Sequence, residues 1–70
     1  MPYLTPKAVE ALGIAGLTAL ANNPAMPTAA RSVALALSKL APLLENLSPV
    51  VEIVQHLCDS WNHTFGLTSP

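Results

Sequence analysis

TAARSVALALSKLAPLLENL, residues 28–47, is the stretch that decides the fold. Its large apolar residues recur at intervals of four and three, which places them on one side of an α-helix. They are Val33, Leu37, Leu40, Leu44 and Leu47. Pro42 falls almost opposite them, and the stripe keeps its phase across this proline. We therefore expect one helix over 28–47 with a kink at Pro42. The alternative is a break, with Pro42 in the first turn of a separate short helix.

Two further helices are predicted on either side of this stretch. Thr5-Pro6 is a helix start signal, because the threonine side chain caps the helix and the proline has no N–H to leave unpaired. Ser48-Pro49 repeats the signal. The intervening residues 22–27 contain two asparagines and two prolines, which is typical of a loop. We expect helices at about 6–21 and 49–65.

The composition is short of charge for a soluble chain of 70 residues. Apolar residues make up 51% and charged residues 10%, with a net charge of −1. An average soluble domain has about 25% charged residues, and a chain of this size buries only about 60% of its unfolded surface. Proteins near zero net charge also tend to associate. We predict one all-α domain over 1–70, a small three-helix bundle completed by oligomerisation or by a partner chain.

The same composition excludes several classes of function. Three basic residues are too few for the positive surface that nucleic-acid binding needs. Their scarcity also disfavours a membrane-bound amphipathic helix, and the most apolar window, 33–51, contains Lys39 and Glu45. A single cysteine excludes an internal disulfide. The opening MPYLTPKAVE lacks the layout of a signal peptide, so we expect a cytoplasmic protein.

Five residues are candidates for contact with another chain. The expected buried face of helix 6–21 contains Val9, Leu12, Leu17 and Leu20. Gly13 and Gly16 fall on the same face, where the lack of a side chain lets a second helix come close. That helix belongs either to the same chain or to a partner. Ile14 and Leu35 fall on outer faces, which predicts a second contact surface. Trp61 lies in the middle of the apolar face of helix 49–65 and suits either a core or an interface.

Functional side chains cluster only on the polar face of helix 49–65. Glu52, His56, Asp59 and His63 share this face with Gln55 and Asn62. Imidazole with carboxylate is a ligand set for divalent metal ions. One helix rarely supplies more than two ligands, so such a site would need a second copy of the helix. The plainer interpretation is a solvated face. Cys58 falls on the apolar face, far from both histidines, and we expect a buried thiol rather than a nucleophile.

These observations favour a non-enzymatic structural or interaction protein. We identify no catalytic residue, no cofactor site and no phosphate-binding glycine pattern. The expected partner is protein, either copies of this chain or a larger complex. Three alternatives remain: a membrane-associated amphipathic protein, a small regulator that docks one helix on a target, and a metal-binding module using the polar face of helix 49–65.

Overall fold

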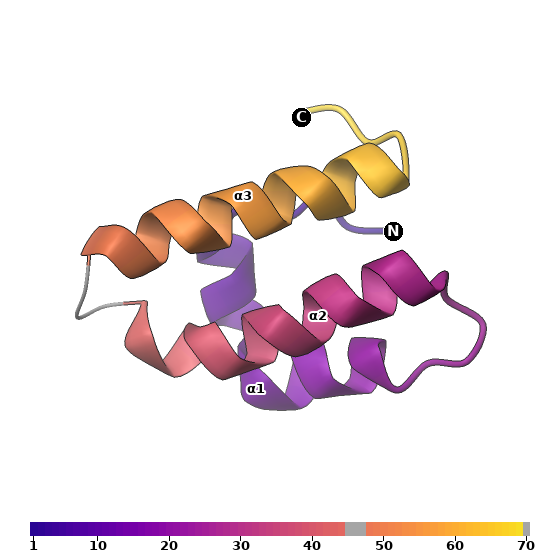
Figure 1. Cartoon of the computed structure of the whole chain (residues 1–70), viewed down its shortest axis with the longest axis horizontal. Coiled ribbons are helices and arrows are strands. Elements are labelled where there is room, and N and C mark those ends of the chain that lie inside the picture. Colours follow the sequence, from indigo (N-terminus) through magenta and orange to yellow (C-terminus); the bar gives the residue numbers. More distant parts are fainter. Residues whose placement is uncertain (45–47, 70) are drawn as a thin grey trace.

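The computed structural model describes residues 1–44 and 48–69, and the described residues form an all-α fold without strands. This confirms the predicted fold class. The elements are α1 (Pro6–Ala21), α2 (Thr28–Leu40), the short 3-10 helix η1 (Ala41–Leu43) and α3 (Ser48–Thr64). Helices α1 and α2 pack most extensively, and α3 packs on α2. Figure 1 shows α2 and α3 as two rods of opposite direction, with α1 behind them.

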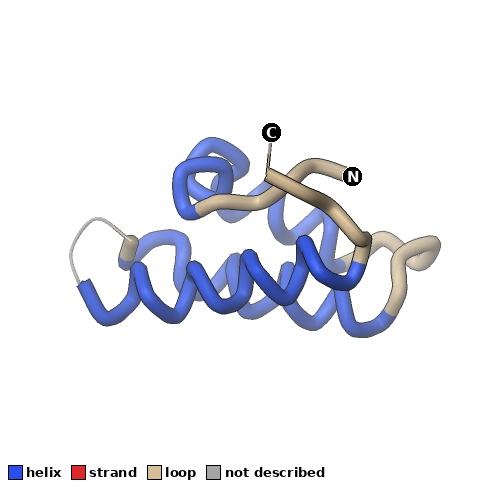
Figure 2. The backbone as a smooth tube through the Cα atoms, turned by 90° about the horizontal axis from the view of Figure 1, so that it is seen from above, coloured by secondary structure: helices blue, strands red, loops and turns tan. Residues whose placement is uncertain are grey.

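Helix α1 is not the straight rod that the sequence pattern predicts, because it breaks at Gly13. This residue has φ 66° and ψ −178°, a conformation that essentially only glycine adopts. The first part, residues 6–12, crosses behind α3, and the second part, residues 14–21, runs beside α2 (Figure 1). Figure 2 shows the first part nearly end-on while the other helices lie across the view. One glycine therefore turns the chain between two packing directions.

The predicted helix start and faces of α1 are confirmed despite the break. The hydroxyl of Thr5 accepts a hydrogen bond of 3.1 Å from the N–H of Ala8, and Pro6 follows as the first helical residue. Val9 and Leu17, one on each side of Gly13, are fully buried. Both parts of α1 thus turn their predicted apolar side to the core.

The helix expected over 28–47 ends earlier than predicted. The α-helix stops at Leu40, and the chain continues as the 3-10 helix Ala41–Leu43, which contains Pro42. A proline has no N–H to donate, so the regular hydrogen-bond pattern cannot continue through position 42. The break that we weighed as the alternative describes this better than a kinked helix. Residues 45–47, the end of the predicted helix, lie outside the described residues.

The core of α2 is formed by smaller residues than the sequence analysis placed there. Ala30, Ala34 and Leu37 have no exposed surface, whereas Leu40 is only partly buried. Ala30 and Ala34 lie one turn apart and fill this part of the core with small side chains. The predicted stripe therefore identified the correct side of the helix, and its members Leu37 and Leu44 are buried.

Helix α3 ends at Thr64, close to the predicted boundary, through a glycine stop. Gly66 has a φ of 63°, and the N–H of Leu67 donates a hydrogen bond of 2.8 Å to the carbonyl of Asn62. A second bond of 3.1 Å joins the Gly66 N–H to the His63 carbonyl. This pattern satisfies the last carbonyls of a helix. It also turns Leu67 back onto the core.

Candidate interaction surface

Trp61 lies inside the protein and is not accessible to a partner in this conformation. Its side chain is fully buried, and its indole N–H donates a hydrogen bond of 3.0 Å to the carbonyl of Pro2. The ring meets that of Phe65 edge-to-face, with ring centres 4.9 Å apart. Of the two interpretations left open by the sequence, the structure supports the core anchor.

Asn62 is a buried polar residue that the sequence analysis placed on the solvated face. Its side chain is 5% exposed. Its Oδ1 accepts a hydrogen bond of 2.7 Å from the Leu4 N–H, and its Nδ2 donates one of 2.8 Å to the Leu4 carbonyl. The amide thus satisfies both backbone groups of one extended residue. A sequence signal existed, since position 62 continues the run of buried residues at 50, 54 and 58, each four apart.

The two glycines predicted as a close-contact site do not face another helix. A Cβ at Gly13 would meet no atom within 4 Å. A Cβ at Gly16 would meet only the side chain of Leu12, at 3.2 Å, in the same helix.

Ile14 and Leu35 are exposed, as the sequence analysis expected. Ile14 is 55% exposed and Leu35 is 48% exposed. Residues 11–30 contain no charged side chain. The second part of α1 therefore presents to solvent a surface made of Ile14, Ala15, Thr18 and Ala19. We call these four residues together with Leu35 the outer surface.

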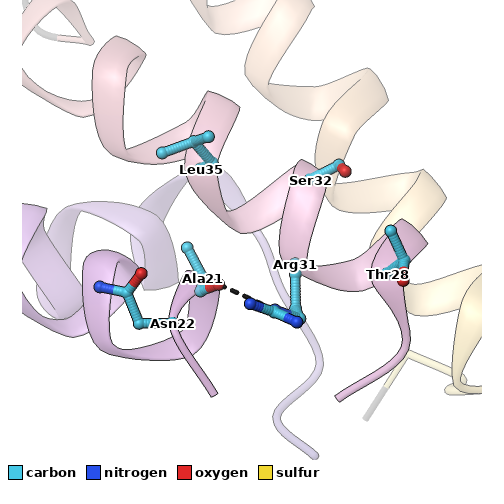
Figure 3. A pocket seen from close by; sticks show the side chains of 6 residues that line it. All are labelled: Ala21, Asn22, Thr28, Arg31, Ser32 and Leu35. Atoms are coloured by element: carbon cyan, nitrogen blue, oxygen red, sulfur yellow. Dashed lines mark hydrogen bonds between the residues drawn. The ribbon is translucent and has the colours of Figure 1, made fainter. Parts of the chain in front are cut away.

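A shallow hollow of about 300 Å³ borders the outer surface where α1 ends and α2 begins. Ala21 and Leu35 both line it, so Leu35 lies on the side of α2 that borders α1 (Figure 3). The Arg31 Nε donates a hydrogen bond of 3.1 Å to the Ala21 carbonyl, at the negative end of α1. This contact satisfies a helix-end carbonyl and fixes the arginine at the edge of the hollow. The remaining lining residues are Asn22, Thr28 and Ser32.

The polar face of α3 does not gather its candidate ligands around one point. Glu52, His56, Asp59 and His63 are all exposed, and the Asp59 carboxylate accepts a hydrogen bond of 3.0 Å from the side chain of Gln55. Among the described residues, no three His, Cys, Asp or Glu side chains lie close enough to hold a metal ion. A metal site would still need ligands from a second copy of α3.

Cys58 is a buried thiol with low reactivity. Burial raises the pKa of this thiol to about 11, and the negative charge of Asp59 adds to the effect. The thiolate, which is the reactive form, is therefore scarce at neutral pH. The sequence expectation of a small buried side chain agrees with this environment.

Comparisons with known proteins give no relative for this chain. No protein family model, no curated protein and no solved structure matches it. In the described part of the chain, every helix is too short or too polar to span a lipid bilayer. Any function must therefore be argued from the surfaces described above.

Proposed function

We propose that this chain is a non-enzymatic helical assembly protein that associates through its outer surface, with a second copy as the partner. The observation that carries the proposal is the pair of exposed apolar side chains, Ile14 and Leu35, of which Ile14 lies in the stretch 11–30 that contains no charged residue. Charged residues are depleted at the centres of protein interfaces, and the outer surface has that composition.

The charge balance favours a second copy over a charged partner. The net charge is −1, so two copies repel each other little. A twofold interface brings the same residues together from both chains, and an uncharged apolar surface meets this requirement without opposing like charges. A larger apolar partner would use the same surface.

Sedimentation of the full chain at tens of micromolar tests this proposal. We expect the wild type to associate, and we expect Ile14→Lys and Leu35→Lys each to yield monomers with unchanged helicity. Ala11→Lys and Ala29→Lys are matched controls on α1 and α2, because both positions are exposed, lie outside the outer surface and gain the same charge. A wild type that is monomeric at this concentration would overturn self-association.

A further inference from the structure

Residues 1–12, which we call the arm, are connected to the rest of the protein through a single bend at Gly13. The bend is set by the backbone, because its φ of 66° and ψ of −178° are accessible to glycine and not to other L-residues. Lack of space is not the reason for a glycine here, since a Cβ at this position would meet no atom within 4 Å. Gly13 thus has the position and the conformational freedom of a hinge.

The arm docks on α3 through contacts that join distant parts of the sequence. Asn62 pairs with both backbone groups of Leu4, and Trp61 donates to the Pro2 carbonyl. Leu4 is 1% exposed. The partners in these contacts lie 58 and 59 residues apart along the chain. The arm of a second copy carries the same groups and fits the same site on α3.

The sequence of α1 is compatible with a straight helix as well as with the bent one. Val9, Leu12, Leu17 and Leu20 fall on one side of an uninterrupted helix over 6–21. Such a helix needs only that Gly13 adopt ordinary helical angles, and it would be about 24 Å long. In that form the arm leaves its own α3, which exposes Leu4 on the arm and Trp61 on the bundle.

From the hinge, the docked arm and the uninterrupted pattern, we infer that this chain forms a dimer by exchanging arms with a second copy. When Gly13 straightens, the arm of each chain docks on the Trp61–Asn62 site of the other. Exchange of identical elements restores every contact of the closed monomer, so it forms a dimer at little cost in contacts. Arm exchange occurs through buried contacts and does not depend on the association proposed for the outer surface.

Substitutions at Gly13 test this inference, because they choose between the bent and the straight form. Gly13→Ala excludes the bend. In a Leu35→Lys background, which removes the association through the outer surface, we expect it to give a dimer at tens of micromolar with higher helicity than Leu35→Lys alone. Gly13→D-Ala, made by chemical synthesis, favours the bend and should yield the closed form.

Two double variants, each made by adding one substitution to the Gly13→Ala protein, separate arm exchange from association through the outer surface. Alanine at position 13 prevents formation of the closed monomer, so the contacts between the arm and α3 exist only in the dimer. Asn62→Ala should then raise the dimer dissociation constant at least about tenfold, through lost hydrogen bonds at both docked arms. Leu35→Lys should leave this constant unchanged. The opposite pattern would assign the dimer to the outer surface and overturn arm exchange.

Refolding keeps the inference testable if Gly13→Ala does not fold. The wild type refolded from denaturant at millimolar concentration should contain a dimer that reverts slowly on dilution, and the Gly13→D-Ala protein should contain none. A folded monomer from Gly13→Ala would overturn the inference. So would an unfolded Gly13→Ala together with a wild type that refolds without this dimer.

Discussion

The two parts of α1 differ in what holds them and in what they leave exposed. The first part, residues 6–12, carries Lys7 and Glu10 and follows Pro2 and Leu4, which Trp61 and Asn62 of α3 hold through hydrogen bonds. The second part, residues 14–21, has no charged residue, packs on α2 and leaves Ile14 in solvent. Directional contacts thus hold the start of the arm, whereas apolar packing holds the second part of α1.

This difference indicates where specificity and association reside in a small chain. The Asn62 amide forms both of its hydrogen bonds only when the Leu4 backbone has one position and orientation, so these bonds fix one arrangement of the arm. Apolar contact of the outer surface is less directional and suits association between surfaces. The following predictions test each region, in order of decreasing effect.

Removing the aromatic anchor of the arm region should have the largest effect. Trp61→Ala empties the centre of the core and leaves the Pro2 carbonyl without its donor, which should cost about 3–5 kcal/mol of unfolding free energy. In a domain of this size that is most of the stability. Urea denaturation followed by circular dichroism measures it. A loss below about 1 kcal/mol would mean that Trp61 does not anchor the core.

The amide contact to Leu4 should rank second. Asn62→Ala leaves a buried N–H and a buried carbonyl without partners, and we expect a loss of about 2–4 kcal/mol in the same assay. His63→Ala, at the next and exposed position, is the control and should change stability by less than about 0.5 kcal/mol. Equal effects from the two variants would place Asn62 on the solvated face after all.

The buried thiol of α3 provides a pH-dependent test of the same interior. Its pKa in the folded state, about 11, lies above the ordinary value of 9.0, so the folded state favours the protonated thiol. The raised pKa of Cys58 therefore adds to the free energy of unfolding in full below pH 9, and this addition is lost as the pH rises towards 11. Cys58→Ala should remove this part of the pH dependence in urea melts. At pH 8, alkylation should be roughly 100-fold slower in the folded protein than in urea.

Enlarging a buried side chain of α2 should have a smaller effect. Ala34→Leu inserts a large side chain at a fully buried position, which should cost about 1–3 kcal/mol. Ala29→Leu makes the same change at an exposed position of α2 and should leave stability nearly unchanged. If Ala34→Leu were tolerated equally well, the core around Ala34 would be packed more loosely than the complete burial of this residue indicates.

Periodicity predicted the helices well because it reports which side of each helix is buried. It correctly placed Val9, Leu17 and Leu37 inside, and Ile14 and Leu35 outside. It could not show the break at Gly13, since the apolar pattern is the same for a straight helix and for this bent one. Gly13 permits the break, and the contacts that hold the arm in the bent form join residues far apart in sequence, which no local pattern contains.

Two other features show the same limit. Asn62 was assigned to the solvated face because its side chain is polar, although its position continues the buried run of α3. The partner of its amide is a backbone 58 residues away, and side-chain patterns carry no information about it. Pro42 signalled a change in α2, but the choice between a kink and a 3-10 helix depends on local packing.

The central claim is that the outer surface is where this chain associates, and an NMR dilution series of the ¹⁵N-labelled wild type tests it most directly. Between millimolar and micromolar concentration, we predict that amide shifts change at residues 14–21 and around Leu35. The amides of Leu4 and α3 should stay fixed, since arm exchange is too slow to follow dilution in this way. Spectra that do not change with concentration, or changes confined to α3, would contradict the claim.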